Sequence, residues 1–471
     1  MVVTLINALP PGWNPPVKRY IKNSVWLLLE KITKLAVAFV LIGLVANQLG
    51  PQDFGVLSLG LSVATIIWAM GNLGLDQILI KEFTQQKYPD SQLLSTTVIC
   101  RLAASALIAI PCLIAIYLAP AFSPEHKLAY AITIGSVLFY NFNSYQALYQ
   151  AKSQSSHIAV IGLSSLCISS LVKIVLLWNE AGLILFCLSA AFDIAMNLLL
   201  YSLYPTKGAV RVRLSAFNVS IVRELWRPAA PMLLCSLMIV VYTRVDQLMI
   251  ASLLGVAQAG VYSVTIRVVE AYAVIPMLVG TAFFPYICTK PDAEKVRTYF
   301  DIVVFSSVAT GLTVWAAAHL AIPLLFGAEY MQALEILGIS MLAAVFSVVG
   351  FACTNYLVAV DLGHLRPLRL GLGLLMNIGL NLMLIPRFGL WGAATATLIS
   401  QIFASWIGNA LSAKTFECLK LQSWSVLTLG LPGVNRVVRE LLGERVSRTK
   451  RSNALQPQSV PSSHVIEPGD A

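Results

Sequence analysis

Twelve apolar stretches joined by short connections are the feature that most constrains what this chain can fold into. Each is close to the roughly 20 residues that cross a bilayer as an α-helix. Inside a bilayer the backbone has to satisfy its own hydrogen bonds, which helices do. The predicted helices cover residues 24–46, 55–78, 92–118, 128–148, 158–178, 182–203, 228–252, 259–286, 300–325, 331–358, 367–385 and 390–413. The sequence therefore predicts an all-α polytopic membrane protein.

Lysine and arginine are sorted between alternate connections. With the N-terminus placed inside, the outer loops carry only Lys127 and Arg387. The inner segments carry Lys18, Arg19, Lys22, Lys81, Lys87, Lys152, Lys207, Arg211, Arg213, Arg223, Arg227, Lys290, Lys295, Arg297, Arg366, Arg369 and a basic tail. This is the positive-inside pattern. We expect both termini in the cytoplasm and the protein in the inner (plasma) membrane.

Composition excludes several other classes of protein. Only 11% of the 471 residues are charged and 58% are hydrophobic, whereas a soluble protein carries about a quarter charged residues. The net charge of +10 is explained by topology and contact with anionic lipid heads. No basic stretch is interleaved with aromatics as a nucleic-acid groove requires. The eight cysteines stand singly without CxxC spacing and the five histidines form no cluster, so we expect no metal site, disulfide or cofactor.

The chain divides into two similar halves. Residues 1–23 form a predicted N-terminal segment, 24–203 and 228–413 hold six helices each, and 204–227 is a basic cytoplasmic linker. Residues 45–58 align without gaps with residues 250–263, at the outer turn after the first helix of each half. Two repeats of six helices share one membrane orientation, so we expect an axis along the membrane normal. Chance alignment of glycine turns is the alternative.

The last segment, 414–471, differs in character. Residues 417–443 mix apolar and basic side chains and could lie along the inner surface as an amphipathic segment, or partly enter the bilayer. Residues 445–471 are rich in Arg, Ser, Pro and Gln and are predicted to be disordered.

Ten charged residues lie inside the predicted spans and outside the first and last five residues of each. The basic ones are Lys31, Lys34, Arg101, Lys173, Arg244 and Arg267, and the acidic ones are Glu30, Asp193, Asp246 and Glu270. A charge at the bilayer centre costs roughly 2.5–3.5 kcal/mol by insertion scales, so such residues usually pair or face a wet cavity. The basic excess suits an anion that carries phosphate, whereas an exporter of cationic drugs is expected to show the opposite balance.

Two charged pairs fall at similar depth on the seventh and eighth helices. Arg244 and Asp246 are two residues apart and therefore face different ways. Pairing of Asp246 with Arg267, or of Arg244 with Glu270, is geometrically possible. These four residues could merely hold the two helices together, or could act on a substrate.

For the remaining charged residues of the spans, the sequence supports the following expectations. Lys34 lies near mid-depth and is a candidate cavity cation. Lys31, Arg101 and Lys173 are expected to extend to the membrane surface along their apolar stems. Asp193 lies near the middle of its helix without a close local partner, which makes it a candidate for protonation or cation coupling.

Three segments resemble the polysaccharide-biosynthesis membrane proteins, the O-antigen and exopolysaccharide flippases of the multidrug/oligosaccharidyl-lipid/polysaccharide exporter superfamily. The first is YTRVDQLMI at 242–250 with the following LG at 254–255 and AGVYS at 259–263. The others are LGPQDFG at 49–55 and NLMLIPRFGLWGAA at 381–394. The resemblance covers about residues 20–412, with the three motifs in the family's order.

The resemblance implies two lobes around a central cavity that rock between inward- and outward-facing states. The implied substrate is a polyprenyl-pyrophosphate-linked oligosaccharide, and the implied energy source is an H⁺ or Na⁺ gradient. Arg244, Arg267 and Lys34 are then the candidates for the phosphate contact, and Asp246, Glu270 and Asp193 for the ion or proton. The lipid II flippases of the superfamily usually carry two more helices, which this chain does not clearly have.

Partners expected on this basis are the lipid-linked oligosaccharide, membrane lipids, and the polysaccharide polymerase and chain-length machinery, with no nucleic acid. We expect no catalytic residues and no enzyme activity, because a polymerase or glycosyltransferase needs a larger extramembrane loop than this chain has. The alternatives are a multidrug or metabolite exporter of the same superfamily, and a non-transporting membrane scaffold of the polysaccharide machinery.

Overall fold

A computed structural model describes residues 15–120, 122–203, 212–288, 292–362, 366–437 and 439. Within these ranges the secondary structure is helical, without strands. The predictions made for the segment before residue 15 and for the tail after residue 439 lie outside the described residues. So do the side chains of Glu30 and Lys31.

The first half contains α2 (Pro15–Gly71), α3 (Asp76–Gln85), α4 (Asp90–Leu118), α5 (Pro124–Gly135), η1 (Ser136–Phe139), α6 (Phe142–Ala151), α7 (Ser155–Trp178) and α8 (Leu183–Leu203). The second contains η2 (Leu214–Ala216), α9 (Val219–Leu254), α10 (Val256–Cys288), α11 (Ala293–Ala321), η3 (Ile322–Phe326), η4 (Ala328–Tyr330), α12 (Gln332–Ala359), α13 (Arg366–Ser405), η6 (Ile407–Leu411), η7 (Ala413–Thr415) and α14 (Phe416–Leu427). Among the described residues, nine helices are long and apolar enough to cross a membrane.

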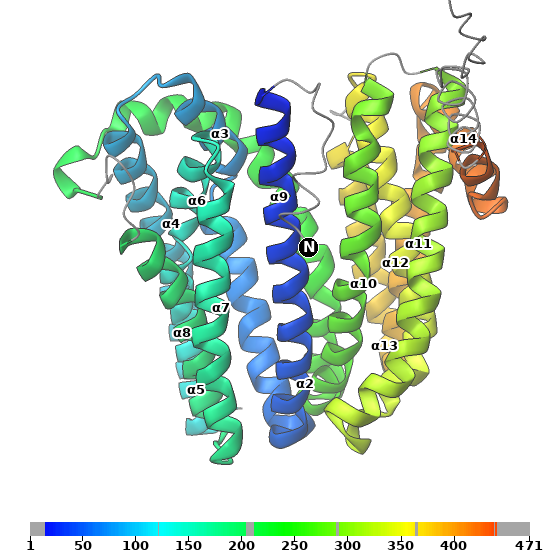
Figure 1. The fold of residues 1–471 in the computed structure, drawn as a ribbon. Helices are drawn as coiled ribbons and strands as arrows, with labels where there is room; N and C mark the ends of the chain where they lie inside the picture. Colours follow the sequence, from blue (N-terminus) through cyan, green and yellow to red (C-terminus); the bar gives the residue numbers. More distant parts are fainter. Residues whose placement is uncertain are drawn as a thin grey trace, which may run out of the picture.

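Two of these nine helices each combine two predicted segments. α2 contains a non-helical residue at Gly50 (φ 71°) and α13 contains one at Gly389 (φ 60°). Both lie in the left-handed region, which glycine enters without a steric penalty. Figure 1 shows the dark blue part of α2 descending and its lighter part returning. The predicted segments 24–46 and 55–78, and 367–385 and 390–413, are therefore joined by tight reversals at glycine.

Several predicted boundaries are wrong. The first helix begins at Pro15, not at residue 24, and α9 begins at Val219, so the end of the predicted linker 204–227 is helical. The Asn218 side chain caps α9 by accepting from the backbone N–H of Ser220. The predicted helix 128–148 is divided into α5, η1 and α6. At this break the Asn141 amide donates to the Leu138 carbonyl, a side-chain bond that competes with helical pairing.

The aligned glycines of the two halves pack against each other reciprocally. Gly50 and Gly255 both have positive φ, at 71° and 98°. A Cβ on Gly55 would lie 2.2 Å from the Val256 carbonyl oxygen, and one on Gly260 would lie 2.1 Å from the Pro51 carbonyl oxygen. In the sequence alignment Gly55 matches Gly260 and Pro51 matches Val256. Such an exchange of contacts is what a two-fold axis produces, so the structure supports the predicted repeat.

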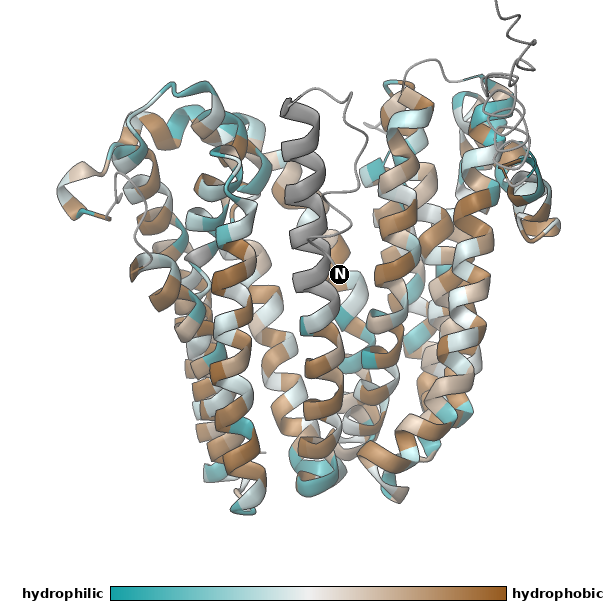
Figure 2. Ribbon diagram, in the orientation of Figure 1, coloured by the Kyte–Doolittle hydropathy of each residue, from teal (hydrophilic) through white to brown (hydrophobic). Residues whose placement is uncertain are grey.

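We call the end of the bundle that carries Gly50 and Gly255 the turn end, and the other the α3 end. The turn end is closed by a dense core in which the Tyr330 hydroxyl donates to the Ala46 carbonyl at 2.9 Å and the Phe54 ring lies edge-on to Tyr330. In Figure 1 α3 and α14 both lie near the upper end of the bundle, on opposite sides of it. Figure 2 shows apolar residues along the helices and hydrophilic ones mainly near the two ends.

The C-terminal part that was predicted as an amphipathic segment packs on α11 at the α3 end. The Arg297 guanidinium lies 4.1 Å from the centre of the Trp424 ring, and the Ser425 hydroxyl donates to Asp301 at 2.5 Å. A Cβ on Gly430 would lie 1.9 Å from the Asp301 carbonyl oxygen. These contacts tie the segment to the bundle.

Arg101 is buried, so the expectation that it extends to the surface is wrong. Its guanidinium donates to Asp76 at 2.9 Å and to the Ser144 hydroxyl at 3.0 Å. Asp76 in turn accepts from the Asn72 amide at 2.7 Å. This network joins α3, α4 and α6 at the α3 end.

The asymmetric burial of this pair leads to a prediction. The Arg101 side chain is 3% exposed and that of Asp76 is 45% exposed. Asp76→Ala leaves a buried guanidinium without its counter-ion, which we expect to cost about 2 kcal/mol or more. Arg101→Met leaves a carboxylate that water can reach and should cost less. Thermal unfolding in detergent would measure both, and the opposite order would contradict this account.

Candidate functional site

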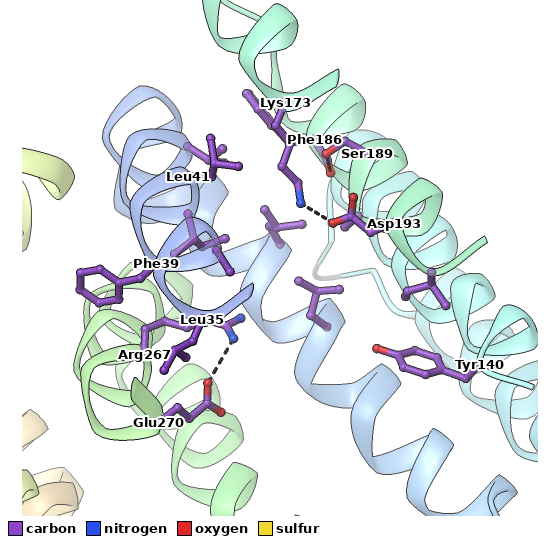
Figure 3. A pocket seen from close by; sticks show the side chains of 17 residues that line it. Leu35, Phe39, Leu41, Tyr140, Lys173, Phe186, Ser189, Asp193, Arg267 and Glu270 are labelled. Carbon is purple, nitrogen blue, oxygen red and sulfur yellow. Dashed lines mark hydrogen bonds and ion pairs between the residues drawn. The ribbon is translucent and has the colours of Figure 1, made fainter. Parts of the chain in front are cut away.

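A cavity of about 350 Å³ lies between the two halves of the bundle. Its wall comes from α2, α7, α8, Tyr140 after η1, and α10. Most lining side chains are apolar, but Lys173 and Asp193 face it from one side and Arg267 and Glu270 from the other (Figure 3). It is the central cavity that the resemblance implied.

Arg244, Arg267 and Glu270 form one cluster on the α10 side of this cavity. The Arg244 guanidinium donates to Glu270 Oε1 at 2.7 Å, and the Arg267 guanidinium donates to Glu270 Oε2 at 3.2 Å. The predicted pairing of Arg244 with Glu270 is therefore observed. The alternative pairing of Asp246 with Arg267 is not among the salt bridges of the described residues.

Lys173 and Asp193 form the second ion pair of the cavity, between α7 and α8 (Figure 3). Two expectations are therefore wrong: Lys173 does not extend to the nearby surface, and Asp193 has a close partner. The lysine stem is long enough to reach back to the middle of the neighbouring helix, where pairing offsets the cost of both charges.

Lys34 is half-buried in α2, directly before Leu35, which lines the cavity. Lys34 is not part of the described cavity lining. The charged residues of the described lining are the cations Arg267 and Lys173 and the anions Glu270 and Asp193, and Arg244 is not part of that lining either. The lining therefore carries no net charge, and the positive excess that the sequence count indicated lies beside the cavity, at Arg244 and Lys34.

Asp246 points away from this cluster into the second half of the bundle, as its spacing from Arg244 predicted. Its Oδ1 accepts from the Asn381 amide at 2.6 Å. Its Oδ2 accepts from the Thr397 hydroxyl, and from the Tyr262 hydroxyl at 3.2 Å. The side chain is buried and lines a pocket of about 130 Å³. Neutral donors thus satisfy a carboxylate that has no ion pair among the described residues.

Sequence reasoning missed the partners of Asp246 on α13. Asn377 and Asn381 are both fully buried, and the Asn381 amide also donates to Asn377 Oδ1 at 3.1 Å. Two asparagines four residues apart on an apolar helix share one face, and buried amides need partners. That spacing is the signal that could have found them. Thr397 carried no such signal.

The pocket at Asp246 adjoins another cavity of about 160 Å³ in the same half. Tyr242, Thr243, Ser347 and Gln401 line both. The second cavity extends to Arg366 and Arg369 at the start of α13. The two adjoining cavities thus lie between Asp246 and the start of α13 at the α3 end.

Comparisons with known proteins agree with this architecture. A model of the family described as polysaccharide biosynthesis protein matches residues 20–290. The chain is 29% identical over 194 residues to the probable flippase AglR of Haloferax volcanii, a match that spans 38% of this chain and 39% of that protein. The match therefore covers well under half of that relative.

Solved structures of similar fold are membrane transporters. The lipid II flippase MurJ, in an inward closed conformation, has a TM-score of 0.63 at 12% identity and covers 90% of this chain and 99% of its own. An inward-facing multidrug resistance MATE family transporter of the MOP superfamily has a TM-score of 0.61 at 13% identity, covering 85% and 95%. A MOP superfamily transporter from Pyrococcus furiosus has a TM-score of 0.54 at 12% identity, covering 87% and 95%. At these identities the likeness shows the fold alone.

Proposed function

This chain belongs to the family of polysaccharide biosynthesis proteins, and we propose that it is a flippase for polyprenyl-pyrophosphate-linked oligosaccharide repeat units. It would move them across the inner membrane for synthesis of O-antigen, exopolysaccharide or capsule, by ion-coupled alternating access with both termini in the cytoplasm. The observation that carries this proposal is the pair of guanidiniums, Arg244 and Arg267, that meet beside a cavity between two helical repeats.

The two arginines are suited to a diphosphate. Guanidinium groups form short, charge-assisted hydrogen bonds with phosphate oxygens. Both come from neighbouring helices and converge on one acceptor, Glu270, so they are already oriented toward a common anion. On this proposal the sugars occupy the water-filled part of the cavity and the prenyl tail stays in lipid. Lys34 would add positive charge nearby.

The coupling ion is assigned to Asp246. Its buried carboxylate lies among the oxygens of Thr397, Tyr262 and the Asn377 amide, and oxygen ligands suit a hard cation such as Na⁺. Binding of a proton by the Asp246 carboxylate would couple transport to an ion gradient equally well. On this proposal the ion exchanges through the adjoining cavity toward Arg366. An ion that binds one lobe arrangement better than the other would bias the transport cycle. Asp193 is less suited, because Lys173 already neutralises it.

The protein is proposed to work without catalytic residues or a cofactor, beside the polymerase and chain-length machinery that use its product. A multidrug exporter is the main competitor, since MATE family transporters share the fold. The two guanidiniums that meet beside the cavity disfavour a cationic drug. A scaffold without transport activity is the remaining alternative.

Deletion of the gene in its host would test the proposal. We expect intact polyprenyl-linked repeat units to accumulate on the cytoplasmic face of the inner membrane, and surface polysaccharide to be lost. Restoration by the wild-type gene and by a copy lacking residues 440–471 would argue against a scaffold that acts through its tail. Unchanged polysaccharide together with increased sensitivity to toxic cations would instead identify a drug exporter.

A further inference from the structure

Glu270 holds both of the arginines that the proposed function assigns to the substrate. One carboxylate oxygen accepts from Arg244 and the other from Arg267. The Glu270 side chain is 39% exposed, whereas those of Arg244 and Arg267 are 16% and 29% exposed. Glu270 is therefore the most exposed member of the cluster.

The geometry of this carboxylate resembles that of a bound oxyanion. Two oxygens on one atom accept hydrogen bonds from two separate guanidiniums, as two oxygens of a phosphoryl group would. A diphosphate that binds Arg244 and Arg267 through these same donors has to replace Glu270 first. The carboxylate and the substrate therefore compete for one pair of cations.

A second location is available to the Glu270 side chain when an anion displaces it from the arginines. Its side chain lines the central cavity and also the pocket that contains Asp246. Thr243, on the adjacent helix α9, lines that pocket and carries a hydroxyl group. A change of side-chain rotamer would move the carboxylate from the cavity toward the pocket without moving the helix.

We propose that Glu270 is an internal competitor, which occupies the phosphate site formed by Arg244 and Arg267 until the diphosphate of the substrate displaces it. This inference rests on the proposed function. The competition weakens substrate binding, and the returning carboxylate speeds release on the far side. It also offsets part of the repulsion between two neighbouring guanidiniums while the cavity is empty.

A purely structural role for Glu270, as a tie between α9 and α10, makes a different prediction. Removal of a tie lowers stability and leaves anion affinity unchanged or weaker. Removal of a competitor raises anion affinity. Glu270→Gln distinguishes the two, because it keeps the size of the side chain and one hydrogen-bond acceptor but loses the charge.

The test is pyrophosphate binding to the purified, detergent-solubilised full chain in magnesium-free buffer, followed by calorimetry. We expect Glu270→Gln to bind about tenfold more tightly than the wild type, since the two charge-assisted bonds of the carboxylate no longer have to be broken and a neutral amide oxygen competes less well. Glu335→Gln is the matched control, because it makes the same change in net charge at an exposed site in α12 outside the cavity. It should bind as the wild type does. Arg267→Ala should bind at least about tenfold more weakly.

The outcomes separate the two proposals. Suppose that the wild type binds pyrophosphate, that Arg267→Ala weakens this binding, and that Glu270→Gln does not tighten it. The proposal that Glu270 competes with the substrate is then wrong, while the phosphate site formed by the arginines is supported. If folded wild type and Glu270→Gln both fail to bind, the phosphate site is wrong as well. Phosphatidylglycerol added in the same detergent should not compete with pyrophosphate. If it did, the site would belong to a membrane lipid and not to the substrate.

Discussion

Asp246→Asn is expected to abolish the response of transport to an ion gradient while leaving the protein folded. Asparagine has nearly the same shape, and the Thr397 and Tyr262 hydroxyls can rotate to accept from its amide. What is lost is the charge that binds a proton or cation. Coupling energies between two ligands are typically 1–3 kcal/mol, so we expect gradient-driven transport to fall by about 5- to 150-fold.

Proteoliposomes that contain a lipid-linked oligosaccharide and carry an imposed H⁺ or Na⁺ gradient would measure this effect. Ser400→Ala is a suitable control. It removes a hydrogen bond of the same pocket wall, from Tyr242 at 2.7 Å, without contacting the Asp246 carboxylate. The control should keep its gradient response. An Asp246→Asn protein that responds to the gradient as the wild type does would remove Asp246 from the coupling mechanism.

Gly260→Ala is expected to force the two halves apart at the turn end. The new Cβ would lie 2.1 Å from the Pro51 carbonyl oxygen, which belongs to backbone and cannot rotate away. Overpacking of this kind costs about 1–3 kcal/mol. The cost falls only on the arrangement in which the turn end is closed. In the proposed alternating-access cycle, the population should therefore shift toward the opposite arrangement by about 5- to 150-fold.

Spin labels at the exposed positions Asn179 and Ser252, one on each half at the turn end, would report this shift as a longer distance. The accessible cysteines have to be replaced first. Gly55→Ala should act in the same way, because its Cβ would meet the Val256 carbonyl oxygen. Gly379→Ala is the matched control, since a Cβ there meets nothing within 4 Å. Equal distance distributions in Gly260→Ala and Gly379→Ala would show that the turn end does not open.

The two predictions concern different parts of one proposed cycle. Asp246 lies inside the second half and is expected to sense the ion, whereas Gly260 lies where the halves meet. A variant that loses the ion response should still show both lobe arrangements. A variant that changes the lobe arrangement should still bind the ion. Measuring the ion response and the lobe arrangement in both Asp246→Asn and Gly260→Ala would distinguish the residue that couples the ion from the contact that controls the lobe movement.

The sequence by itself determined most of the fold. Apolar length and glycine position predict where the chain crosses and where it reverses, as Gly50 and Gly389 show. The gapless alignment of the outer turns predicted the repeat that the contacts of Gly55 and Gly260 support. These features are local, because a helix satisfies its own backbone and a left-handed turn requires glycine wherever it occurs.

The sequence determined the pairing of the charged side chains only in part. Spacing along one helix correctly separated Arg244 from Asp246 and allowed the pair of Arg244 with Glu270. It failed for Arg101 and Lys173, which pair inside the bundle, and it did not find the asparagines around Asp246. Sequence position gives the depth of a charge along its helix. Which neighbouring side chain the charge meets depends on how that helix is rotated and packed. Apolar helices can pack in many rotations that their sequences do not distinguish. For this reason only the tertiary structure decided the partners of these charges.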